Sequence, residues 1–139
     1  IMKASMTDND VVLVDRNCHK SIEQGLMLSG AKPVYMVPSR NRYGIIGPIY
    51  PQEMQPETLQ KKISESPLTK DKAGQKPSYC VVTNCTYDGV CYNAKEAQDL
   101  LEKTSDRLHL DEAWYGYARF NPIYADHYAM RGEPGDHNG

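Results

Sequence analysis

The sequence LHLDEAW, residues 108–114, joins a short apolar run to two carboxylates, a small residue and the only tryptophan of the chain. The apolar run predicts a strand that ends at Asp111. In an open α/β sheet, ligands bind outside the carboxyl ends of the strands, so an acid at this point is placed to meet a ligand. A strand-end aspartate also commonly caps the turn that follows it. The local pattern alone favours neither interpretation.

Three further apolar runs predict strands that are buried on both faces. Residues 11–14 (VVLV), 34–37 (VYMV) and 79–83 (YCVVT) are continuous and rich in β-branched or aromatic side chains. Such runs are typical of parallel sheets, in which helices cover both faces. Together with residues 108–111 they predict a sheet of four strands.

Helix signals occupy the connections between these runs. Ser21 is suited to N-cap a helix that Gly30 would end. Pro56 fits the first turn of a second helix. Asn93, with Glu96 three residues later, predicts a capping box at the start of a third.

Strands that alternate with helical connections predict an α/β fold containing part of a mainly parallel, doubly wound sheet. The loops after the first, third and fourth strands would then lie at one edge of the sheet. They carry His19, Thr86 with Asp88, and Asp111 with Trp114. One pocket at this edge would therefore collect an imidazole, a hydroxyl, a carboxylate and an indole.

The composition is that of a single globular domain, with 139 residues of which 40% are hydrophobic and 24% are charged. A net charge of -2 gives no general attraction to nucleic acid or to anionic membranes, and no apolar run reaches membrane-spanning length. The cysteines form no C-x-x-C pair and have no Cys/His zinc spacing. A thiol within a predicted strand, such as Cys80, is typical of a reduced core residue, which favours a cytoplasmic protein. His127 and His137 also lack ligand spacing and are interpreted as surface histidines, so no metal site is predicted.

The residues at the predicted edge favour a planar cofactor that has a protonatable ring nitrogen. An Asp111 carboxylate would keep such a nitrogen charged, because an opposite charge at close range favours the protonated form. His19 would supply a planar partner for one face of the ring, and Ala113 a small neighbour for the other. The alternative for His19 is a loop histidine bonded to backbone. A further alternative is a different nucleotide-binding α/β domain. The absence of glycine-rich phosphate-binding motifs counts against it.

Three motifs in this order resemble the bacterial ornithine/lysine/arginine decarboxylases: residues 15–21 (DRNCHKS), 86–90 (TYDGV) and 111–114 (DEAW). Residues 43–49 (YGIIGPI) and 119–124 (RFNPIY) resemble the same family. The likeness covers essentially the whole chain. It implies a pyridoxal-phosphate (PLP) enzyme with the aspartate-aminotransferase fold, and places residues 1–139 in the large, cofactor-binding domain.

The resemblance implies a role for each matching residue. His19 corresponds to the histidine that stacks on the pyridine ring, and Asp111 to the acid paired with the ring nitrogen; these two are the predicted catalytic residues. Ala113 corresponds to the small residue against the opposite face and Trp114 to a pocket tryptophan near the cofactor. Thr86 falls in a loop close to the site and completes the predicted cofactor-binding set.

The activity implied is decarboxylation of a basic amino acid, with arginine converted to agmatine and CO₂. The reaction consumes a proton, which would contribute to acid resistance. Lysine and ornithine stay open as substrates, because the residues that read the substrate side chain are not all present. A non-catalytic isolated fragment is the other alternative.

The ends of the chain predict a fragment, since Ile1 is not an initiator and Gly139 ends an unfinished loop. The resemblance implies that a phosphate-binding loop precedes this segment, and that the Schiff-base lysine and a C-terminal domain follow it. It also implies homodimers that assemble into a decamer. Arg40 and Arg42 are interpreted as solvated loop cations, and the role of residues 115–139 is left open.

Overall fold

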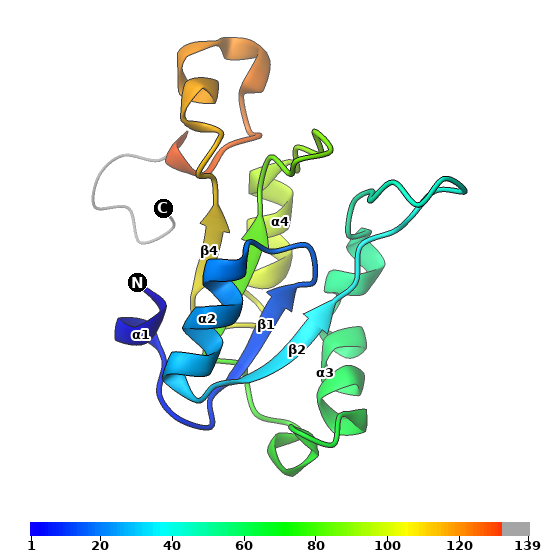
Figure 1. Cartoon of the computed structure of the whole chain (residues 1–139), viewed down its shortest axis with the longest axis vertical. Helices are drawn as coiled ribbons and strands as arrows, with labels where there is room; N and C mark the ends of the chain where they lie inside the picture. The colour runs from blue at the N-terminus through cyan, green and yellow to red at the C-terminus, as the bar shows by residue number, and fades with distance from the viewer. Residues whose placement is uncertain (132–139) are drawn as a thin grey trace.

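The computed structural model describes residues 1–131 and contains a parallel four-stranded sheet in the order β2-β1-β3-β4 (Figure 1). The strands are β1 (Val11–Asp15), β2 (Lys32–Met36), β3 (Tyr79–Thr83) and β4 (Leu108–Asp111). β1, β3 and β4 lie where the apolar runs predicted them, and β2 begins two residues before its predicted run and ends one residue earlier. The predicted fold class, a parallel α/β sheet, is confirmed.

An α-helix occupies each connection between consecutive strands: α2 (Lys20–Ser29), α3 (Pro56–Glu65) and α4 (Ala94–Leu101). A short additional helix, α1 (Met2–Ser5), precedes β1. The remaining elements are short 3-10 helices, η1 (Pro51–Met54), η2 (Lys70–Lys72), η3 (Gly116–Phe120), η4 (Pro122–Tyr124) and η5 (Ala129–Arg131). Within residues 1–131, no helix has both the length and the apolar character needed to cross a membrane.

Two hydrophobic cores cover the two faces of the sheet. Leu13 of β1 packs in a cluster with Leu59 of α3 and Leu101 of α4. Its neighbour Val14 packs in the other cluster, with Ile22 of α2. Successive side chains of a strand point to opposite faces, so a strand covered on both sides must be apolar at every position. This is why the central strands β1 and β3 read as continuous hydrophobic runs.

The direction in which strands are added reverses between β1 and β3. The chain passes from β1 through α2 to β2 at one edge, and then returns through α3 to β3 on the other side of β1. Consequently α2 lies over one face, while α3 and α4 lie over the other (Figure 1). The carboxyl ends of β1 and β3 therefore form a topological switch point, where ligands of doubly wound sheets bind.

The local helix signals are largely confirmed, with one correction. Gly30 ends α2 in the left-handed conformation, Pro56 occupies the first turn of α3, and the Asn93 side chain accepts a hydrogen bond from the backbone N–H of Glu96 at 3.1 Å. The N-cap of α2 is His19 and not Ser21. The extended backbone of residue 19 lets its imidazole reach the first turn, a geometry that the preference of serine for this position does not reveal.

Replacing Gly30 with alanine is expected to lower the free energy of unfolding by about 1–2 kcal/mol, because residue 30 has φ of +71°. A Cβ at this position would also collide with the Asp8 carboxylate. Urea unfolding of the 139-residue chain measures the loss. The control is Gly44→Ala, where φ is +82° but an added Cβ meets nothing within 4 Å. Equal losses in the two variants would exclude a contribution from Asp8.

Candidate functional site

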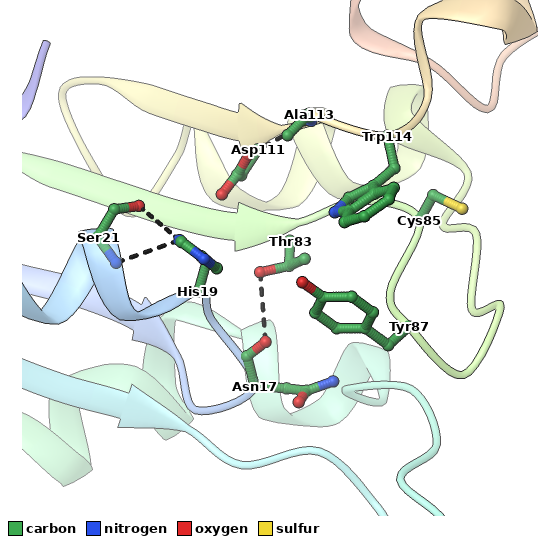
Figure 2. A pocket seen from close by; sticks show the side chains of 9 residues that line it. All are labelled: Asn17, His19, Ser21, Thr83, Cys85, Tyr87, Asp111, Ala113 and Trp114. Atoms are coloured by element: carbon green, nitrogen blue, oxygen red, sulfur yellow. Dashed lines mark hydrogen bonds between the residues drawn. The ribbon is translucent and has the colours of Figure 1, made fainter.

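A cavity of about 390 Å³ lies at the switch point of the sheet. Its size is within the range of cavities that hold small-molecule ligands. Figure 2 shows the side chains around it, which come from the β1–α2 loop and the start of α2, and from the ends of β3 and β4 with the segments that follow them. The lining residues are Asn17, His19, Ser21, Thr83, Cys85, Tyr87, Asp111, Ala113 and Trp114.

Asp111 is the last residue of β4 and lines this cavity. Its side chain is half-buried, and Oδ1 accepts a long hydrogen bond of 3.4 Å from the backbone N–H of Ala113. The carboxylate therefore both caps the turn after β4 and faces the cavity. The two interpretations of this aspartate are compatible, because the turn occupies only one carboxylate oxygen.

The His19 imidazole is fixed by the start of α2. Its Nδ1 accepts a hydrogen bond from the backbone N–H of Ser21 at 3.2 Å and lies 2.9 Å from Ser21 Oγ. An Nδ1 that accepts carries no proton, so this bond corresponds to the tautomer with its proton on Nε2. The same ring lines the cavity (Figure 2). The histidine is bonded to backbone, as the alternative interpretation held, and is also oriented toward the cavity by that bond.

Ala113 and Trp114 form part of the wall next to Asp111. Ala113 is exposed and adds little bulk to the cavity. The Trp114 indole is 65% exposed and meets the ring of Tyr87 edge-to-face, with ring centroids 5.5 Å apart. These two aromatic side chains come from different strand ends and together border the cavity (Figure 2).

Thr86 and Asp88 do not line the cavity. Thr86 is buried, and its Oγ1 accepts from the backbone N–H of Val90 at 3.2 Å, so the hydroxyl closes the loop after β3. Asp88 is exposed in the turn of that loop. Thr86 is therefore not part of the cavity wall, and its contact with a cofactor stays a prediction.

The end of β3 and the loop after it contribute Thr83, Cys85 and Tyr87, which the sequence interpretation missed. They alternate with the buried side chains of Asn84 and Thr86. The backbone between them is not a continued strand, because Cys85 has φ of +60°, in the left-handed region. No periodic pattern in the sequence therefore marks Cys85 and Tyr87 as lining residues, whereas Thr86 stands out by its residue type alone.

Asp15 lies beneath the cavity at the end of β1. It is 1% exposed, and its two carboxylate oxygens accept from the backbone N–H groups of Asn17 (2.7 Å) and Thr83 (3.2 Å). Burial raises the pKa of this carboxyl, and the two hydrogen bonds oppose the rise. Asn17 and Thr83 both line the cavity, so Asp15 joins two segments of its wall.

The arginines of the long loop after β2 are exposed, as predicted. Arg40 donates to the carbonyl of Gly44 at 3.1 Å. Arg42 lies over the ring of Tyr43, with its guanidinium carbon 4.7 Å from the ring centroid. Both contacts are local to the loop, and neither arginine lines the cavity.

The prediction that His127 is a surface histidine is wrong. The side chain is half-buried, with Nδ1 at 3.1 Å from the carbonyl oxygen of Tyr92. Segment 115–131 folds back toward the sheet, which its lack of periodicity did not reveal. His137 lies outside the described residues. Among residues 1–131, no three histidine, cysteine, aspartate or glutamate side chains gather into a possible metal site.

The four cysteines carry free thiols, as predicted. Cys80 is fully buried in β3, which agrees with its interpretation as a core residue. Cys85 is half-buried and lines the cavity.

A family profile described as "Orn/Lys/Arg decarboxylase, major domain" matches residues 1–139. The biodegradative arginine decarboxylase of Escherichia coli (strain K12) is 96% identical over 139 residues, covering 100% of this chain and 18% of the relative. The lysine decarboxylase LdcA of Pseudomonas aeruginosa is 48% identical over 121 residues, covering 87% of this chain and 16% of the relative.

Solved structures agree with these relatives. The structure of E. coli constitutive lysine decarboxylase aligns with a TM-score of 0.84 at 34% identity, covering 95% of this chain and 18% of that one. Lysine decarboxylase A from P. aeruginosa aligns with a TM-score of 0.83 at 46% identity, covering 91% of this chain and 17% of that one. The chain thus spans less than a fifth of the length of these proteins. It belongs to the Orn/Lys/Arg decarboxylase family.

Proposed function

We propose that this chain forms part of the cofactor site of a PLP-dependent decarboxylase that converts arginine to agmatine and CO₂. The observation that supports the proposal most strongly is the meeting of the Asp111 carboxylate and the His19 imidazole in one cavity at the switch point of the sheet. The 96% identity to a biodegradative arginine decarboxylase favours arginine over lysine, since the lysine decarboxylase LdcA is 48% identical.

The residues around the cavity fit the cofactor chemically. Asp111 would pair its carboxylate with the pyridine nitrogen, and His19 would place its flat ring against the cofactor, since both line the cavity. Ala113 would add little bulk beside the cofactor, and Trp114 borders the same cavity. The bound cofactor would act as a sink for the electrons released when CO₂ departs. The contribution of the chain is to hold the ring and to keep its nitrogen charged.

The remaining features of the proposal concern the full-length protein. We propose that residues 1–139 belong to the PLP-binding large domain, and that the Schiff-base lysine and C-terminal domain lie in other parts of the polypeptide. The protein would act in the cytoplasm as homodimers assembled into a decamer, and its proton consumption would support acid resistance. This chain covers 18% of the E. coli arginine decarboxylase, which is compatible with a lysine segment and a C-terminal domain elsewhere in the polypeptide.

A substrate comparison tests the proposal. The full-length protein, saturated with PLP, is assayed for CO₂ release from arginine, lysine and ornithine at equal concentrations. A higher kcat/KM for arginine supports the proposal, and a higher kcat/KM for lysine or ornithine would make that amino acid the substrate instead.

PLP titration of the 139-residue chain, with a dinucleotide as control ligand, shows whether the isolated segment retains affinity for PLP. Dinucleotide binding without PLP binding would contradict the cofactor assignment.

Changing His19 to asparagine is expected to raise the Kd for PLP roughly 2- to 10-fold, corresponding to the loss of an aromatic stacking partner. Asparagine is itself a favourable N-cap, so the start of α2 is retained. The companion variant His19→Phe keeps a flat ring but loses the cap. It should lower stability more and PLP affinity less than His19→Asn. Equilibrium dialysis and thermal melts of the full-length protein measure both effects. Unchanged PLP affinity in His19→Asn would make His19 only a helix cap.

A further inference from the structure

We infer that Asn84 is a positioning residue, which sets the relative placement of the two strand ends that carry Asp111 and Tyr87. The inference rests on the proposed function, since Asn84 acts on the proposed cofactor site through its neighbours and does not line the cavity itself. Asn84 follows the last residue of β3 and is 1% exposed.

The Asn84 side chain uses its full hydrogen-bonding capacity. Its Nδ2 donates to Glu112 Oε1 at 2.6 Å and to the carbonyl of His127 at 2.8 Å. Its Oδ1 accepts from the backbone N–H groups of Cys85 at 3.1 Å and Tyr92 at 3.0 Å. An amide has two donor hydrogens and two acceptor lone pairs, so every position is occupied. Only an amide of this length can make the same four bonds.

Two of the bonds of Asn84 hold the β4 side of the cavity. The backbone N–H of Asn84 donates to the carbonyl of Asp111 at 2.9 Å, and its side chain binds Glu112, the next residue. Glu112 Oε1 also accepts from the backbone N–H of Ala129 at 2.8 Å. The chain is therefore fixed immediately beside Asp111 and before Ala113. A shift of Glu112 would displace both neighbours in the proposed cofactor site.

The acceptor oxygen of Asn84 holds the β3 side. By binding the N–H groups of Cys85 and Tyr92, it closes the loop that carries Tyr87. Cys85 has φ of +60°, a left-handed conformation that is costly for a non-glycine residue and persists only where surrounding bonds enforce it. The Tyr87 ring then meets Trp114 edge-to-face. One buried amide thus sets both sides of the cavity border.

The decisive variant is Asn84→Asp in the full-length protein. Aspartate has nearly the same shape but replaces two donors by acceptors, which would face Glu112 Oε1 and the His127 carbonyl. We expect kcat to fall about 10- to 100-fold and the Kd for PLP to rise about 10-fold, in line with the loss of charge-assisted hydrogen bonds. The KM for arginine should change less than kcat, because Asn84 acts on the wall of the cofactor site.

The matched control is Asn93→Asp, the same chemical change at the N-cap of α4, where aspartate is an equally good cap. Its kcat and PLP affinity should equal those of the wild type. Circular dichroism and thermal melts identify the temperature range in which each variant is folded, and the kinetic measurements are made within it. If Asn84→Asp matches Asn93→Asp in kcat and PLP affinity, the inference is overturned.

A second variant tests the Asn84–Glu112 bond directly. It also keeps the inference testable if Asn84→Asp does not fold. In Asn84→Asp/Glu112→Gln, an amide and a carboxylate again face each other with their roles exchanged. Folding, PLP affinity or kcat should recover in part relative to Asn84→Asp, giving non-additive effects. Strictly additive losses, or a double variant no better folded than the single one, would overturn the inference. A wild-type protein that binds no PLP would instead refute the proposed function, so the two failures are distinguishable.

Discussion

Asp111→Ala in the full-length protein is expected to lower kcat by roughly 150- to 5,000-fold, which corresponds to the 3–5 kcal/mol lost when one partner of a buried charge pair is removed. Under the proposed function, the protonated ring nitrogen of the cofactor would lose its counter-charge and would tend to release its proton. The electron sink would then be weakened in every turnover. Steady-state kinetics with saturating PLP measure the effect.

Asp111→Asn separates the two roles of this side chain. Asparagine can still accept the hydrogen bond from the Ala113 N–H, so the turn after β4 is kept, but the negative charge is lost. If the charge matters, Asp111→Asn should lose nearly as much activity as Asp111→Ala. Asp88→Ala, in an exposed turn of the neighbouring loop, is the matched control and should leave kcat unchanged. Near-normal turnover in Asp111→Asn would reduce Asp111 to a turn residue.

Asp15→Ala is expected to lower the free energy of unfolding by about 2–5 kcal/mol, because it leaves two part-buried backbone N–H groups without acceptors. Those groups belong to Asn17 and Thr83, on the loop after β1 and at the end of β3. The two strand ends at the switch point lose their shared acceptor. Urea unfolding of the 139-residue chain measures the change, with Asp88→Ala expected to stay within about 0.5 kcal/mol of the wild type. A similarly small loss in Asp15→Ala would show that its bonds contribute little.

The pH dependence of this effect has a definite sign. Burial raises the pKa of Asp15 above its ordinary value of 3.8, so above that pH the folded chain retains a proton that the unfolded chain releases. Increasing pH through this window therefore lowers the contribution of Asp15 to the free energy of unfolding. Asparagine does not titrate, so Asp15→Asn should gain stability relative to the wild type as the pH rises from 3 to 6. A difference that is constant or falls would contradict the raised pKa.

The fold and the principal site residues were predictable because their signals are local or follow from topology. Burial on both faces makes the central strands β1 and β3 continuous apolar runs, and β1 reads as four consecutive aliphatic residues before Asp15. Parallel strands then bring their carboxyl ends to one edge. That rule alone places His19 and Asp111 near the same cavity, although they are far apart in the sequence.

Residue type misled the sequence interpretation at two positions. Ser21 is the more common helix cap, but the imidazole of His19 takes the position. Thr86 has a hydroxyl suited to a ligand, but it closes a loop while Thr83 and Tyr87 line the cavity. In both cases the backbone conformation determined which side chain could reach the bond.

The sequence by itself determined the four-stranded parallel sheet, its helical crossovers and the edge at which polar residues collect, because hydrophobic periodicity and chain connectivity specify them. Only the tertiary structure determined that Asp15 joins β1 to β3 and that Asn84 joins β3 to Glu112 and the segment after it. Thr83 is 68 positions from Asp15, and Glu112 is 28 positions from Asn84. Hydrogen bonds over such separations leave no periodic pattern in the chain, since they depend on where folding brings each buried polar atom.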